Sequence, residues 1–185
     1  MKKGKRNQKF MRAESAILMA FFVDKGLPKP GVVARRAKIS RSTFFRHHKT
    51  PYDMIIDYEK VIYSRYLGMI RNISGDKNAR LKEIYLRMLI FINRNQQEIK
   101  LVLKYKNSQI FEKMIWRLKN KIYEEYDLPS NFEQFFGIYA KEIAGVLEGW
   151  GKQNFDISQI EAILKKILYL TDTLGERLKP ILEKN

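Results

Sequence analysis

The stretch PGVVARRAKISRSTFFRHHKTPYDMI, residues 30–55, decides the fold of the N-terminal part of this chain. Pro30 suits the first turn of a helix, where its missing N–H would be unpaired in any case. The helix breaks at residues 38–40, and Ser40 then serves as the N-cap of a second short helix from Arg41 to about His48. Two short helices joined by a tight turn predict a helix-turn-helix.

Helical signals continue on both sides of this stretch. Upstream, apolar residues follow a spacing of about 3.6 residues over positions 13–25, which predicts a first helix. Downstream, Thr50 is a capping residue, Pro51 occupies the first helical position and Asp53 is the acidic partner of a capping box. We expect the helix that begins here to run to Ile73.

The remainder of the chain also predicts helices. We expect them at about residues 78–94, 97–106, 108–126, 132–150 and 157–182. Apolar and polar residues rarely alternate, so strands are not expected. The predicted fold class is all-α, with about nine helices. A three-helix head containing the helix-turn-helix occupies residues 1–60, and a C-terminal helical bundle occupies residues 61–185.

The charge of the chain is concentrated in the head. The 185 residues include 36 Lys and Arg against 20 Asp and Glu, a net charge of +16. Residues 1–49 hold 14 of the basic side chains and only Glu14 and Asp24 as acids, a net charge of +12. Such an asymmetry predicts a polyanion-binding head on a nearly balanced body. The polyanion is either nucleic acid or an acidic membrane surface.

The composition argues against an enzyme, a metalloprotein and a membrane-spanning protein. Cysteine is absent, which excludes disulfides, zinc–thiolate sites and thiol catalysis. The only histidines, His47 and His48, are adjacent and would point about 100° apart on a helix, so they cannot readily share one metal ion. No phosphate loop or Ser-His-Asp set occurs. The longest uncharged apolar run, residues 16–23, is too short to span a bilayer. We expect no catalytic, cofactor or metal site, and a cytoplasmic protein.

The second short helix carries the residues that suit contact with DNA. Phe44 and His48 share one face at i, i+4, and the arginines lie on another. Arginine can read guanine or clamp phosphate, and hydroxyl groups near a helix N-terminus can donate to phosphate oxygens. The DNA-binding residues that we expect are Lys29, Arg41, Ser42, Thr43, Phe45, Arg46, His47 and Lys49.

These residues resemble the DNA-binding head of the tetracycline-repressor (TetR) family of transcriptional regulators. The family pattern is an Ile-Ala pair, a Gly-Val-Ser turn and then Thr-Leu-Tyr-x-x-Phe. Here the pair is Val33-Ala34, the turn ends in Ile39-Ser40, and residues 43–48 read Thr-Phe-Phe-x-x-His. The resemblance implies a homodimeric regulator of double-stranded DNA, in most cases a repressor, with a small-molecule ligand in the C-terminal domain relieving repression.

The resemblance also implies that the last two helices form the dimer interface. Their apolar residues are then divided between that interface and the core of their own subunit. The sequence does not divide them: Ile138, Ile143, Val146, Leu147, Ile160, Ile163, Leu164, Ile167, Leu168 and Leu174.

Four positions depart from the family pattern. Lys38 replaces the turn glycine, so it must adopt an unusual backbone conformation or the turn must differ. Phe45 replaces a DNA-facing tyrosine, and Pro51 replaces a phosphate-contacting lysine for which Lys49 can substitute. His48 replaces a core phenylalanine and is expected to be a packed, neutral ring.

Two other functions remain compatible with the sequence. The missing tyrosine and lysine favour an interaction protein that retains the fold but has lost specific DNA binding. The basic N-terminal arm, MKKGKRNQK, followed by Phe10 and Met11, is compatible with a peripheral membrane protein. The +12 charge of residues 1–49 favours the DNA-binding regulator.

Overall fold

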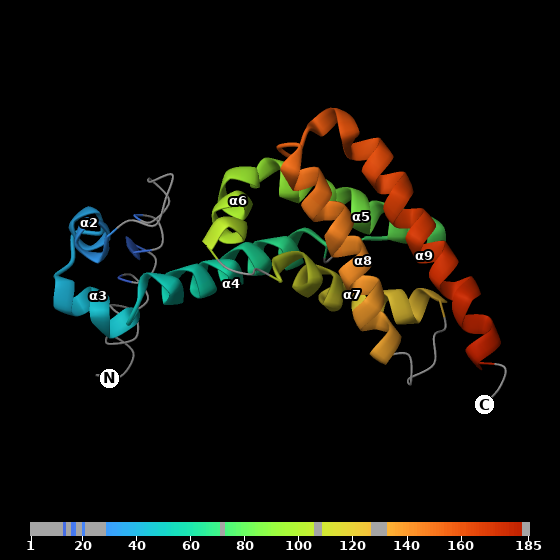
Figure 1. Cartoon of the computed structure of the whole chain (residues 1–185), viewed down its shortest axis with the longest axis horizontal. Helices are drawn as coiled ribbons and strands as arrows, with labels where there is room; N and C mark the ends of the chain where they lie inside the picture. The colour runs from blue at the N-terminus through green and yellow to red at the C-terminus, as the bar shows by residue number, and fades with distance from the viewer. Residues whose placement is uncertain are drawn as a thin grey trace. The chain divides into compact units, whose positions relative to one another are not determined.

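The computed structural model describes residues 13, 16, 17, 20, 29–70, 73–105, 109–126 and 133–182, and all regular structure in them is helical. The predicted all-α fold class is therefore confirmed. Of the first predicted helix, the four described residues are helical, and the N-terminal arm lies outside the described residues. The helices (Figure 1) are α2 Pro30–Arg36, α3 Arg41–His47, α4 Pro51–Met69, α5 Lys77–Arg94, α6 Gln96–Tyr105, α7 Ile110–Tyr126, α8 Glu133–Lys152, η2 Ile157–Gln159 and α9 Ile160–Leu182.

The C-terminal end of α4 differs from the prediction. The helix was expected to reach Ile73, but it ends at Met69. The Nη1 atom of Arg87, on α5, donates a hydrogen bond of 2.9 Å to the carbonyl oxygen of Met69. Because a side chain from another helix satisfies this carbonyl, it does not require the N–H of residue 73, and the helix can stop there.

The predicted helix over residues 157–182 is also divided. It starts with the short 3-10 turn η2, and α9 follows directly. Asp156 caps this turn, because its Oδ1 atom accepts a hydrogen bond of 3.0 Å from the amide of Ser158. The tighter first turn therefore has a local cause, as short 3-10 segments at helix ends often do.

The chain divides into two compact units. The first consists of residues up to Ile62 together with residues 101–106, and the second of residues 63–100 and 107–185. Helix α4 continues from one to the other, since the division falls between Ile62 and Tyr63. Buried apolar residues of the first unit come from the first predicted helix, α2, α3, α4 and α6: Ile17, Ala20, Val33, Ala34, Phe44, Met54, Ile55, Tyr58, Ile62, Leu101 and Val102.

The second unit is a helical bundle with an aromatic core. Within it α8 packs against both α7 and α9, and α5 packs against α9 (Figure 1). No helix in the described ranges combines the length and apolar character needed to cross a bilayer. The largest fully buried aromatic residues of this unit are Tyr66, Tyr85, Phe111, Phe136, Tyr139, Trp150 and Phe155.

The corner between α8 and α9 is built on an unusual backbone. Asn154 and Phe155 have φ of 62° and 53°, and a bulky side chain rarely adopts such a conformation. The Phe155 ring is fully buried, with its centroid 5.2 Å from that of Trp150. Its carbonyl oxygen accepts a 2.8 Å hydrogen bond from Asn93 of α5. Burial and this hydrogen bond offset the backbone cost and hold the corner on the bundle.

A buried group of hydroxyls joins three helices of the bundle. Tyr85 of α5 is hydrogen-bonded to Tyr139 of α8, whose OH lies 2.7 Å from Oγ1 of Thr171 on α9. Thr171 Oγ1 in turn donates to the carbonyl oxygen of Ile167 at 2.8 Å. Burial raises the pKa of Tyr85 to about 12, against the opposing effect of the hydrogen bonds from Thr171 and Tyr139. The phenol therefore remains a neutral hydrogen-bonding group in the folded protein.

The raised pKa of Tyr85 predicts a loss of stability in alkaline solution. In the unfolded chain a tyrosine loses its proton near pH 10, about two units earlier than Tyr85 does in the folded chain. The stabilisation is complete below pH 10 and is lost as the pH rises toward 12, because only the unfolded state releases the proton in that range. Urea unfolding between pH 8 and 11.5 should show this decline.

Tyr85→Phe should make the decline shallower by about 1.4 kcal/mol per pH unit, the contribution of one proton. Tyr139 keeps Thr171 as a partner in this variant. Tyr169→Phe, at an exposed position, is the control for loss of a tyrosine hydroxyl. Equal slopes for wild type and Tyr85→Phe would contradict the prediction.

Candidate nucleic-acid interface

The first element of the candidate interface is α2, and residues close to its start in the sequence determine where it begins. Pro30 occupies its first position, as predicted. The carbonyl oxygen of Lys29 accepts hydrogen bonds from the amides of Val32 and Val33, at 2.8 and 3.2 Å, and so starts the helix. On the inner side Val33 and Ala34 are buried. These small apolar residues allow α2 and α3 to pack closely.

The turn from α2 to α3 is closed by two backbone hydrogen bonds. The amide of Lys38 donates to the Arg35 carbonyl at 3.1 Å, and the amide of Ile39 donates to the Ala34 carbonyl at 3.0 Å. This pair of bonds is the Schellman arrangement, which requires a left-handed residue just after the helix. Lys38 has φ of 54°. Of the two alternatives expected for this position, an unusual backbone at Lys38 or a different turn, the structure shows the first.

The start of α3 is a network of hydroxyl groups. Ser40 Oγ accepts a hydrogen bond of 3.0 Å from the amide of Thr43, which confirms Ser40 as the N-cap. The same oxygen lies 2.8 Å from Ser42 Oγ and 2.9 Å from Thr43 Oγ1. Arg46 donates from Nη2 to Thr43 Oγ1 at 3.4 Å. The hydroxyls predicted to contact phosphate are therefore held together at the first turn.

The two faces of α3 have opposite character. Phe44 and His48 are buried, as expected, and their ring centroids lie 5.8 Å apart. Phe45 is 50% exposed, although it follows Phe44 directly. Arg41, Ser42 and Arg46 are exposed as well. The inner face is therefore fixed in the core, and the outer face presents one apolar and two cationic side chains.

All charged residues on the outer surface of α2, the turn and α3 are Lys or Arg. Between positions 29 and 52 the chain has no acidic residue, and every basic side chain there is exposed. We call this set the basic surface: Lys29, Arg35, Arg36, Lys38, Arg41, Arg46 and Lys49. The sequence prediction omitted Arg35, Arg36 and Lys38, although their place in the last turn of α2 and in the turn itself could have indicated them.

Arg41 lies across α2. A Cβ atom built on Gly31 would come within 2.8 Å of Nη2 and 3.0 Å of Nε of Arg41. The guanidinium therefore rests against the first turn of α2, where glycine leaves room for it. The sequence gives no signal for this contact, because the nine positions between the two residues contain most of a helix and a turn.

All eight residues predicted to bind DNA are at least partly accessible. Five are on the exposed surface of α3 and its flanks: Lys29, Arg41, Ser42, Arg46 and Lys49. Phe45 is half-exposed. Thr43 and His47 are partly buried, so they present less of their side chains to the surface than the other six residues do.

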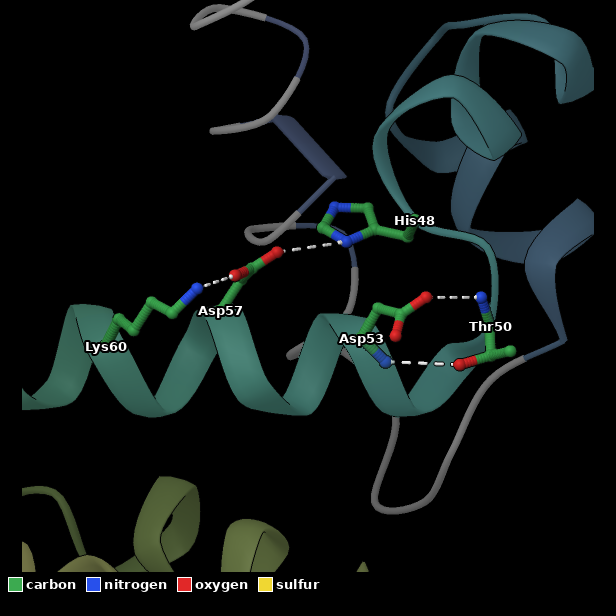
Figure 2. Close-up of polar contacts among 5 residues, drawn as sticks. All are labelled: His48, Thr50, Asp53, Asp57 and Lys60. Atoms are coloured by element: carbon green, nitrogen blue, oxygen red, sulfur yellow. Dashed lines mark hydrogen bonds and ion pairs between the residues drawn. The ribbon is translucent and has the colours of Figure 1, made fainter.

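The first turns of α4 contact the residues that end and follow α3 (Figure 2). Thr50 and Asp53 form the predicted capping box, with the Thr50 amide donating to Asp53 Oδ2 at 2.8 Å and the Asp53 amide donating to Thr50 Oγ1 at 3.3 Å. One turn further along, Asp57 Oδ2 lies 3.4 Å from Nδ1 of His48. Its other oxygen, Oδ1, accepts from Lys60 Nζ at 2.7 Å. The His48–Asp57 contact was not predicted.

No protein-family model, curated protein or solved structure matches the chain. The residues of the basic surface and their geometry therefore carry the functional conclusion.

The left-handed backbone at Lys38 predicts that glycine would stabilise the turn. A non-glycine residue pays about 1–2 kcal/mol for this conformation, part of which glycine returns as extra entropy in the unfolded chain. Lys38→Gly should therefore raise the free energy of unfolding of the head by about 0.5–1 kcal/mol, measured by amide hydrogen exchange of α2 and α3.

Lys38→Ala is the matched control, since it removes the same charge and keeps the free-energy cost of a non-glycine residue at positive φ. Lys38→Val should be worse than alanine, because a β-branched residue is poorly suited to a positive φ. Equal exchange rates in the glycine and alanine variants would show that the backbone conformation carries no cost here.

Proposed function

We propose that this protein is a sequence-specific DNA-binding transcriptional regulator that acts as a repressor, with α2, the turn and α3 forming a helix-turn-helix. The observation that carries the proposal is the basic surface. Its seven exposed cations are unopposed by any acid between positions 29 and 52. They surround a short helix whose inner face is buried. A rigidly held helix with a cationic rim is what major-groove recognition requires.

Electrostatics supports a nucleic-acid partner. Each basic side chain that neutralises a phosphate releases a condensed counterion, so affinity is gained without sequence preference and falls steeply with salt. The exposed lysines suit this role, because an ammonium group acts as a point charge toward phosphate. Lys29 and Lys49 flank α2 and α3 on the sequence, and Lys38 lies in the turn between them. They supply phosphate contacts on this proposal.

Sequence preference is assigned to the exposed face of α3. Arg41 lies in its first turn, and a guanidinium can form two hydrogen bonds with the edge of a guanine. Phe45, one turn further along, offers an apolar edge for a thymine methyl group. The packing of the Arg41 guanidinium against Gly31 favours this role, because a restrained side chain loses less entropy on binding.

A regulator with one recognition helix per chain needs two chains to read a symmetric site. We place the homodimer contact on the outer faces of α8 and α9. Ile138 on α8 is 59% exposed and Tyr169 on α9 is 66% exposed. On α8, a Cβ built at Gly145 or Gly149 would meet nothing within 4 Å. Glycine in a helix costs about 1 kcal/mol relative to alanine, and close approach of a partner helix would explain both positions.

A binding experiment tests the function. The full chain is used to select duplexes from a random pool, and its affinity for the selected duplex and for a shuffled duplex is measured between 50 and 300 mM salt. We expect a clear preference for the selected duplex and a linear fall of log affinity with log salt. Binding to anionic lipid vesicles but not to duplex DNA would favour a membrane-surface protein. Duplex binding without sequence preference would favour an interaction protein.

Three variants test the assignment of α3. Arg41→Ala should cost about 1–3 kcal/mol on the selected duplex and much less on the shuffled one, and Phe45→Ala should weaken selected binding while the head stays folded. Phe44→Ala should cost about 3–5 kcal/mol of stability as a large-to-small core change. Normal binding by Arg41→Ala would remove base recognition from that position.

The dimer contact predicts a change of mass. Light scattering at micromolar concentration should give twice the 22.0 kDa mass of the chain. Combining Ile138→Glu with Tyr169→Glu should give the single-chain mass, because two carboxylates would be buried without partners in the interface. Phe45→Glu, also at an exposed apolar position, is the control and should leave the mass unchanged. A wild-type mass of 22.0 kDa would end the claim.

A further inference from the structure

His48 is placed where it can fix the C-terminal end of α3. It is the residue that ends the helix, with φ of −136° and ψ of 117°, and its amide still donates to the Phe44 carbonyl at 3.0 Å. Its side chain is fully buried. The ring therefore projects from the C-terminal end of α3 toward α4. Figure 2 shows it over that helix, pointing at Asp57.

The contact with Asp57 brings a ring nitrogen close to a carboxylate oxygen. Nδ1 of His48 lies 3.4 Å from Oδ2 of Asp57, which is one quarter exposed. Lys60 holds the second carboxylate oxygen at 2.7 Å. This second ion pair is largely solvated, because the Lys60 side chain is 71% exposed, so it adds little to the orientation of Asp57. An apolar ring at position 48 would fill the same space without a preferred direction.

Three anchors then define the position of α3. At the N-terminus the Ser40 cap fixes the first turn, and in the middle the buried Phe44 ring fixes the depth. Both anchors lie at or before the middle of the helix, and the buried His48 ring adds a third at its C-terminal end. The orientation of the outer face depends on it, and base readout tolerates little misplacement.

We propose that His48 and Asp57 are positioning residues for the DNA-facing side of α3, so that their contact sets sequence preference and not merely stability. The proposal rests on the proposed function, because it assigns a role in the readout of DNA. It predicts that removing either partner lowers the ratio of affinities for the selected and shuffled duplexes. Uniform changes in phosphate attraction cancel in that ratio.

The test is a double-mutant cycle on the full chain. His48→Phe keeps a buried ring and removes its nitrogens, and Asp57→Asn keeps the shape and removes the charge. Each single change is expected to lower the affinity ratio about tenfold, and the double variant should be no worse than either. Lys60→Gln is the matched control, since it breaks the other ion pair of Asp57 at a side chain that is 71% exposed. Its ratio should stay within about twofold of wild type.

Thermal unfolding separates positioning from folding, because the proposal expects the single variants to stay folded at the temperature of the binding assay. If His48→Phe fails to fold, Asp57→Asn still decides the matter, since its carboxylate is partly solvated. If the wild type discriminates between the duplexes, additive effects of the two substitutions, or affinity ratios in the variants equal to that of the wild type, would overturn this inference but not the proposed function. A wild type that shows no preference for any duplex would overturn the proposed function and this inference with it.

Discussion

The burial of one face of α3 is the constraint on which the functional surface depends. Phe44 and His48 are sealed in the core of the first unit, and a helix of seven residues has only one other side to present. Arg41, Phe45 and Arg46 are exposed because Phe44 is not. The packing free energy of a buried phenylalanine, about 3–5 kcal/mol by substitution, therefore also fixes the direction of the polar side chains. The stability of the first unit and the direction of its exposed basic side chains therefore share one cause.

Helix α4 connects this surface with the rest of the chain. Its first part carries the capping box and Asp57 in the first unit. In the second unit its later part is held by hydrogen bonds, since Tyr63 donates to the Lys113 carbonyl at 3.1 Å and Arg117 donates to the Tyr63 hydroxyl at 2.6 Å. The same helix is thus bonded at both ends to residues outside it.

The second unit closes its helical bundle at a corner with a strained backbone. Two consecutive residues at the α8–α9 corner, Asn154 and Phe155, have positive φ, and a buried aromatic cluster offsets that cost. The Tyr85–Tyr139–Thr171 hydroxyls then tie α5, α8 and α9 together inside the core. Buried hydroxyls need every hydrogen bond satisfied, so they tolerate few alternative packings. On the outer faces of the same helices, Ile138 of α8 and Tyr169 of α9 remain exposed.

By itself the sequence determined the all-α class and the starts of the helices at Pro30, Ser40 and Pro51, because caps act between residues a few positions apart. It also determined which side of α3 is inward, since i, i+4 spacing places Phe44 and His48 together. Only the tertiary structure decided that α4 ends at Met69, where a side chain 18 positions away takes the last carbonyl. It alone joined His48 to Asp57 and Arg41 to Gly31. It also divided the apolar residues of the last two helices, burying Ile143, Leu147, Leu164 and Ile167 while leaving Ile138 exposed. Every one of these outcomes depends on which distant segment packs against a residue, and neighbours along the chain carry no record of that.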